Sequence, residues 1–142
     1  MLCKSLSEGE RFRCAGNDYL MLLPRDLTDC CEVVLEKVAV GRRTPPNAHA
    51  TFNQIYIVLS GDAEITIGDK TSRVCAPAVA YIPQNTNHYA VNMGTVELQY
   101  LYVSVWPQGI PAKEKDGGWR QAYVDIIQEY VDRGYPVDEG CR

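Results

Sequence analysis

Short apolar runs separated by turn residues fill the first three quarters of the chain. Val, Ile, Leu and Tyr are concentrated in these runs, and many of the runs alternate apolar with polar positions, as strands with one buried face do. Eight runs fit this description: residues 10–14, 19–23, 31–40, 54–59, 63–67, 79–82, 89–91 and 96–106. Gly, Asn, Asp and Pro separate them, which is turn chemistry. Short, closely spaced strands with no helix between them predict an all-β antiparallel sandwich or barrel.

The last quarter of the chain has a different pattern. Residues 107–118 are rich in Pro, Gly and Lys, and the stretch WRQAYVDIIQEYVDRG that follows repeats its apolar residues at helical spacing. Gly134 and Pro136 predict that this helix ends near Arg133. We expect an amphipathic helix that packs across the barrel or against a second subunit. The residues on its apolar face are Trp119, Tyr123, Ile126, Ile127 and Tyr130.

Length, charge and cysteine content narrow the possible functions. The 142 residues fit one domain, and the formal net charge of -4 is spread along the chain rather than gathered into a basic stripe, so nucleic acid is not an expected partner. The N-terminal stretch MLCKSLSEGERFR lacks the apolar core of a signal peptide, and no later apolar run reaches the length of a bilayer span. We therefore expect a cytoplasmic protein that does not enter a membrane. The six cysteines match no metal-ligand spacing, and we interpret them as reduced thiols.

The two histidines of the chain, His49 and His88, stand at predicted strand–loop borders, where ligands are commonly displayed. Each belongs to a spaced motif. The first motif consists of Gly41, five residues, Asn47-Ala48-His49, four residues, Gln54, six residues and Gly61. The second consists of Pro77, five residues, Pro83-Gln84-Asn85, two residues, His88, three residues and Asn92. In order and internal spacing, the pair resembles the two motifs of the cupin superfamily.

This resemblance implies a double-stranded antiparallel β-helix, the jelly-roll barrel of the small single-domain cupins. We expect one cupin domain over residues 1–142, with the conserved barrel at about residues 31–106 and a linker and helix at 107–142. Pro77 and Asn85 stand where the second motif has glycines; Asn tolerates left-handed backbone, whereas Pro suggests a strand start or a bulge. Because cupin barrels commonly associate through sheet edges, the resemblance, the long strand 31–40 and the aromatic helix together favour a homodimer.

The resemblance also implies a set of metal ligands. Transferred position by position, the first His of the family becomes Asn47, the second remains His49, the Glu becomes Gln54 and the last His remains His88. Two imidazoles favour a divalent transition metal (Zn, Ni, Mn, Fe or Cu), while carboxamides are weaker, neutral donors. Such a set leaves the double charge of the ion uncompensated, so we expect it to attract a small anionic molecule.

Strand alternation predicts which side chains share the cavity with these ligands. Counting by twos places Tyr56 and Val58 on the face of Gln54, and Ala90 and Asn92 on the face of His88. Tyr56 is the candidate catalytic residue, because its phenol could donate to a bound oxyanion or serve as an acid. A tyrosine is also a common strand filler, and that interpretation stays open.

Three functions remain open from the sequence. The similarity to pectin-degradation cupins, which share a His-x-His, Gln, His ligand set, implies a metal-dependent isomerase or tautomerase acting as a Lewis acid on a uronate or keto acid. The second is a non-catalytic binding or sensing domain whose Asn47 and Gln54 form hydrogen bonds in a metal-free barrel. The third is a metal-dependent dioxygenase, which the two carboxamides disfavour because it must hold a redox metal firmly. The sequence alone leaves open whether the chain is an enzyme.

Overall fold

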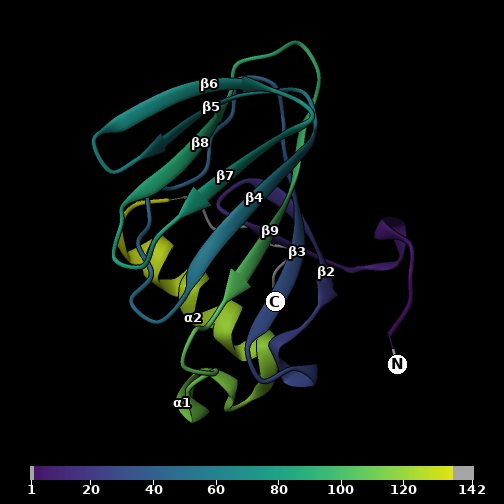
Figure 1. The fold of residues 1–142 in the computed structure, drawn as a ribbon, viewed down its shortest axis with the longest axis vertical. Helices are drawn as coiled ribbons and strands as arrows, with labels where there is room; N and C mark the ends of the chain where they lie inside the picture. Colours follow the sequence, from purple (N-terminus) through teal and green to yellow (C-terminus); the bar gives the residue numbers. More distant parts are fainter. Residues whose placement is uncertain (1, 136–142) are drawn as a thin grey trace.

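Two antiparallel sheets form the body of the protein in the computed structural model, which describes residues 2–135. The larger sheet has the strand order β1-β2-β3-β9-β4-β7, and the smaller one has the order β6-β5-β8 (Figure 1). The strands are β1 (Glu10–Cys14), β2 (Asn17–Leu23), β3 (Cys31–Val38), β4 (Asn53–Ser60), β5 (Asp62–Ile67), β6 (Lys70–Cys75), β7 (Ala78–Ile82), β8 (His88–Asn92) and β9 (Leu98–Val105). This is the jelly-roll barrel expected from the sequence.

Four helical elements complete the described part of the chain. Two are 3-10 turns, η1 (Leu6–Glu8) and η2 (Arg25–Leu27), and two are α-helices, α1 (Ala112–Lys115) and α2 (Gly118–Asp132). Figure 1 shows α2 crossing behind the lower ends of β4 and β9. Gly134, with a φ of 90°, follows the end of α2 as predicted, and Pro136 lies outside the described residues. No helix within residues 2–135 is long and apolar enough to cross a lipid bilayer.

The strand alternation read from the sequence holds on the inner face of the large sheet. Gln54, Tyr56 and Val58 of β4 are all buried, at 6%, 5% and 0% exposure, so they share one face as expected. On β8, the residues that share the inner face with His88 are also buried. The inner faces of the two sheets therefore define the space in which a ligand could be held.

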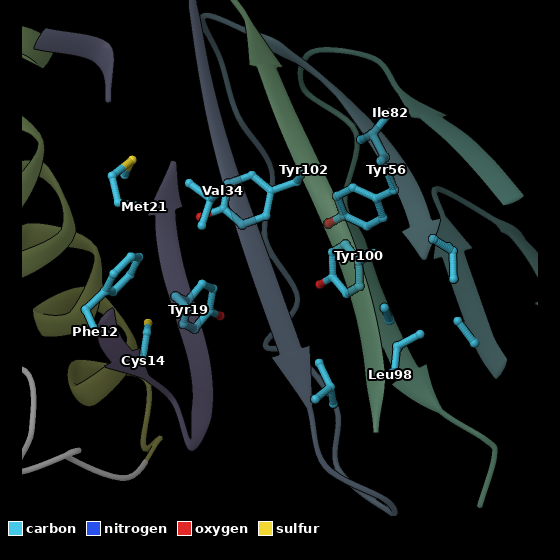
Figure 2. Close-up of a cluster of buried hydrophobic side chains, with 14 of the residues drawn as sticks. Phe12, Cys14, Tyr19, Met21, Val34, Tyr56, Ile82, Leu98, Tyr100 and Tyr102 are labelled. Carbon is cyan, nitrogen blue, oxygen red and sulfur yellow. The ribbon is translucent and has the colours of Figure 1, made fainter. Parts of the chain in front are cut away.

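An aromatic cluster fills much of this space and draws α2 onto the barrel. Phe12 of β1 stacks on Tyr19 of β2 with ring centroids 4.9 Å apart, and it contacts Tyr123 and Trp119 of α2 at 4.7 and 5.4 Å. Figure 2 shows Tyr56, Tyr100 and Tyr102 side by side on β4 and β9. The apolar face of α2 is thus buried against its own barrel, which confirms the first of the two arrangements expected for it.

The structure also differs from the sequence-based expectations in three places. Strand β6 was not predicted, because KTSRVC is exposed on both faces and so lacks alternation. The short helix α1 lies inside the segment expected to be a linker. Strand β3 is paired with β2 on one side and with β9 on the other, so the long strand 31–40 does not supply the open sheet edge invoked for a homodimer.

Asn85 has the left-handed backbone expected of it, with a φ of 58°.

Candidate functional site

A cavity of about 70 Å³ lies between the two sheets, and helix α2 forms part of its wall. All five site residues expected from the sequence, namely Asn47, His49, Gln54, Tyr56 and His88, line it. Its other walls come from β1, β2, η2, β3, β9, the segment that leads into β4, and α2. The barrel therefore brings residues of both motifs together with residues from outside them.

His88 begins strand β8 and is 3% exposed. Its Nδ1 lies 2.9 Å from the Thr86 carbonyl oxygen, and a carbonyl can only accept a hydrogen bond, so Nδ1 carries the proton. Burial lowers the pKa of His88, which leaves the ring neutral. Its Nε2 then presents a lone pair to the cavity, in the tautomer that a metal ligand needs.

The Gln54 carboxamide faces that lone pair. Its Oε1 lies 3.1 Å from His88 Nε2, and its Nε2 donates to Ser104 Oγ at 3.2 Å. Two lone-pair atoms at this distance repel each other unless a cation lies between them or the carboxamide rotates to present its N–H groups to the ring.

His49 supplies the second imidazole. Its ring centroid is 5.1 Å from that of His88, and the ring stacks on Phe52 at 4.3 Å. Burial, followed by the proximity of His88, lowers the pKa of His49 to about 3. Both histidines are therefore neutral at physiological pH and can offer a lone pair, while Phe52 fixes the plane of the His49 ring.

Asn47 is engaged differently from the other three expected ligands. Its backbone exchanges two hydrogen bonds with His88, at 2.9 and 3.1 Å, so the two side chains stand on the same side of this bridge. Its carboxamide donates from Nδ2 to the Tyr130 hydroxyl at 2.9 Å and accepts at Oδ1 from the Ala48 N–H at 2.9 Å. Asn47 thus stands beside the site, with both ends of its carboxamide occupied by protein groups.

Tyr56, the expected catalytic residue, packs against the same imidazole. Its ring lies edge-on to His88 with centroids 6.1 Å apart and contacts Tyr100 at 4.7 Å. Burial, reinforced by the negative charge of Glu36, raises the pKa of Tyr56 well above its usual value near 10. Its phenol therefore stays protonated and is suited to donating a hydrogen bond rather than to acting as a base.

If a divalent transition metal binds in this cavity, His49, Gln54 and His88 are the residues that would hold it, as three neutral donors. Among residues 2–135, no group of three His, Cys, Asp or Glu side chains could hold a metal ion, so any such centre depends on a carboxamide. The donors match the chemistry of the ion in type and protonation, and they provide no compensating negative charge.

Sequence reasoning missed a buried ion pair at the wall of the cavity. Arg25 of η2 binds the Glu32 carboxylate through two hydrogen bonds, at 2.8 and 2.9 Å, and the two side chains are 6% and 1% exposed. Its remaining guanidinium nitrogen donates to the Glu114 carbonyl at 3.3 Å. Each guanidinium nitrogen of Arg25 thus has a protein partner, and the Glu32 carboxylate balances its positive charge.

A second buried carboxyl group, Glu36, was also missed. It accepts from Tyr19 at 2.7 Å and from Tyr100 at 2.5 Å, and Figure 2 shows the two hydroxyl groups turned toward one another across β3. Burial raises the pKa of Glu36 to about 7, against the opposing effect of these two hydrogen bonds. Counting by twos along β3 could have found both glutamates, because Glu32 and Glu36 share the inner face with buried Val34.

Comparison with known proteins shows which protein family the chain matches. The sequence profile of the cupin domain matches residues 34–104, which is half of the chain. An uncharacterized protein of Methanocaldococcus jannaschii is 34% identical over 70 residues, or 49% of this chain and 56% of that protein. The chain thus spans little more than half the length of this relative.

Solved structures show the same fold. A predicted oxalate decarboxylase from Thermotoga maritima superposes with a TM-score of 0.67 and 20% identity, covering 74% of this chain and 99% of that one. KdgF from Halomonas sp. gives a TM-score of 0.63 and 18% identity, covering 72% of this chain and 92% of that one. At these identities the likeness establishes the fold alone.

Proposed function

The chain belongs to the cupin domain family, and from this premise we propose that it holds a divalent transition metal through His49, Gln54 and His88 and acts as a Lewis acid on a small anionic metabolite. The supporting observation is the contact between His88 Nε2 and Gln54 Oε1 at 3.1 Å. Both atoms carry lone pairs in the neutral side chains, and a shared cation turns their repulsion into attraction.

The ion, when bound, supplies Lewis-acid polarisation of a carbonyl group. The chain contributes the environment for that chemistry. His88 is fixed in one tautomer by the Thr86 carbonyl, Phe52 holds the His49 ring in place, and Tyr56 keeps its proton, so that it can donate to an oxygen of the bound molecule. The Lewis-acid role favours an isomerase or tautomerase type of reaction.

Charge and size support a small anionic ligand. The described cavity wall carries one cation, Arg25, which Glu32 neutralises, so attraction for an anion has to come from a bound metal. A cavity of about 70 Å³ is much smaller than the roughly 300–1,000 Å³ of sites for drug-sized molecules. Short keto acids and dicarboxylates suit this volume better than a hexuronate does, and the Thermotoga maritima neighbour is itself described as a predicted oxalate decarboxylase.

The test is elemental analysis of protein purified without an affinity tag and then offered Zn²⁺, Ni²⁺ or Mn²⁺. We expect near-stoichiometric metal in the wild-type protein and a clear loss of metal in His88→Ala and in Gln54→Ala. Gln99→Ala is the matched control, because Gln99 lies outside the cavity and bonds to Glu97 on the surface. Metal that never exceeds trace levels, or that survives both site substitutions unchanged, would refute the proposed centre.

A metal-free binding domain is the second candidate, and one observation favours it. If the Gln54 carboxamide is rotated, its N–H group bonds to His88 Nε2 and its oxygen accepts from Ser104, which satisfies all three side chains without an ion. This arrangement predicts that chelators leave ligand binding unchanged. The metal centre predicts that chelators abolish it.

A further inference from the structure

We propose that the phenol of Tyr130 donates its O–H to an oxygen of the bound anion, beside the position where Asn47 replaces a ligand histidine. This inference rests on the metal centre proposed above. It assigns Tyr130 as a binding residue and Asn47 as the residue that positions it.

The direction of one hydrogen bond carries the inference. Asn47 Nδ2 lies 2.9 Å from Tyr130 Oη, and a carboxamide nitrogen can only donate, so the phenol oxygen is the acceptor. The hydroxyl hydrogen of Tyr130 is consequently left to bond elsewhere. The Asn47 Oδ1 atom does not accept this hydroxyl hydrogen, because Oδ1 already accepts a hydrogen bond from the Ala48 N–H. Since Tyr130 lines the cavity, its proton is available to a molecule held there.

The position of this phenol follows from the backbone bridge between Asn47 and His88. That bridge places the Asn47 side chain on the same side as the His88 imidazole, so the hydroxyl that Asn47 binds stands at the margin of the three-donor set. An oxygen of an anion bound there could accept a charge-assisted hydrogen bond from the Tyr130 O–H. Burial raises the pKa of Tyr130 above its usual value near 10, so this proton is present at neutral pH.

Helix α2, which carries this phenol, lies outside residues 34–104, the part of the chain that the cupin profile matches. The Arg133 guanidinium at the end of α2 donates to the Pro46 carbonyl at 2.6 Å, and Tyr135 packs edge-on to Tyr130 with centroids 5.9 Å apart. This helix therefore adds a preorganised donor to the barrel, and such a donor costs little ordering entropy when a ligand binds.

The experiment compares metal binding with anion binding in the same protein. Wild type, Tyr130→Phe, Asn47→Ala and the double variant are loaded with Co²⁺, and pyruvate is titrated while the d–d absorption of the ion is recorded. Loss of one charge-assisted hydrogen bond should weaken pyruvate binding by about 10- to 100-fold in Tyr130→Phe, while Co²⁺ affinity changes by about 2-fold or less. Tyr135→Phe is the matched control, since it removes a neighbouring phenol that does not line the cavity.

Coupling between the two residues tests the positioning role of Asn47. If Asn47 acts through Tyr130, the double variant loses no more pyruvate affinity than Tyr130→Phe alone. Additive losses overturn the positioning role, and equal pyruvate affinity in wild type and Tyr130→Phe overturns the inference while leaving the metal centre intact. Failure of the wild type to take up Co²⁺, or to bind pyruvate once loaded, overturns the proposed function and this inference with it. Thermal unfolding of each variant identifies any loss of affinity that comes from misfolding.

Discussion

Replacing Glu36 with Gln should change how the stability of the protein depends on pH. Glu36 is 4% exposed and accepts hydrogen bonds from Tyr19 and Tyr100. The carboxamide has almost the same shape and is neutral at every pH. It can accept from one phenol and donate to the other, whose hydroxyl then acts as the acceptor. The substitution therefore removes a titrating group while leaving the packing nearly unchanged.

The sign and size follow from the pKa values. The pKa of Glu36 is raised from 4.5 to about 7 on folding, mainly by burial, so between these values the folded protein binds more protons than the unfolded chain. Its contribution to stability is fully present below the unfolded pKa and is lost as the pH rises through the folded pKa. Linkage gives a loss of about 2–3 kcal/mol between about pH 5 and pH 8. Glu36→Gln escapes this loss and should gain that amount relative to wild type.

Urea unfolding followed by tryptophan fluorescence can measure this difference, because Trp106 and Trp119 are both buried. Contributions from His49 cancel when the variant is compared with wild type at each pH. Glu97→Gln, at an exposed position, serves as the control for loss of one negative charge. A free-energy difference between Glu36→Gln and wild type that stays constant from about pH 5 to pH 8 would refute the argument that burial controls this carboxyl group.

Three further predictions follow from the ion pair, the exchanged ligand and the sheet surface. Arg25→Met should lower the free energy of unfolding in urea by about 3–5 kcal/mol, because it leaves the buried Glu32 carboxylate without its partner. Adding Glu32→Leu should recover most of that loss. Equal stability of the single variant Arg25→Met and the double variant would contradict this prediction. Asn47→His should raise Zn²⁺ affinity by about 10-fold or more in a chelator competition, since a third imidazole joins the donor set; unchanged affinity would show that this position does not face the ion. We expect a homodimer through the outer face of β4 and β7, where Val79 and Tyr81 are 69% and 57% exposed. Light scattering should find the variant Val79→Lys monomeric. A monomeric wild-type protein would exclude this interface.

Much of the barrel could be predicted from the sequence because strand alternation is a local property. Gln54, Tyr56 and Val58 were placed on one face from their spacing, and the structure buries all three. The two motifs likewise placed His49 and His88 at the same cavity. Strand β6 escaped prediction because a strand that is exposed on both faces has no hydrophobic period to detect.

The chemistry of the site depended on contacts that the sequence does not encode locally. Ser104 lies between Glu32 and Gln54 in a row that crosses β3, β9 and β4, and this adjacency requires the order of strands in the sheet. The same holds for the hydrogen bond from Asn47 to Tyr130, which joins residues 83 positions apart. Such partners cannot be found by counting along one strand.

The sequence by itself therefore determined most of the strands, several of the side chains that face inward and the pair of histidine motifs, because a period of two and a fixed spacing are properties of neighbouring residues. Only the tertiary structure decided that Asn47 binds a phenol, that Arg25 is neutralised by Glu32 and that Glu36 has a pKa near 7. Each of these depends on burial and on distances between elements far apart in the chain, and electrostatic energies are set by those distances and by the surrounding dielectric.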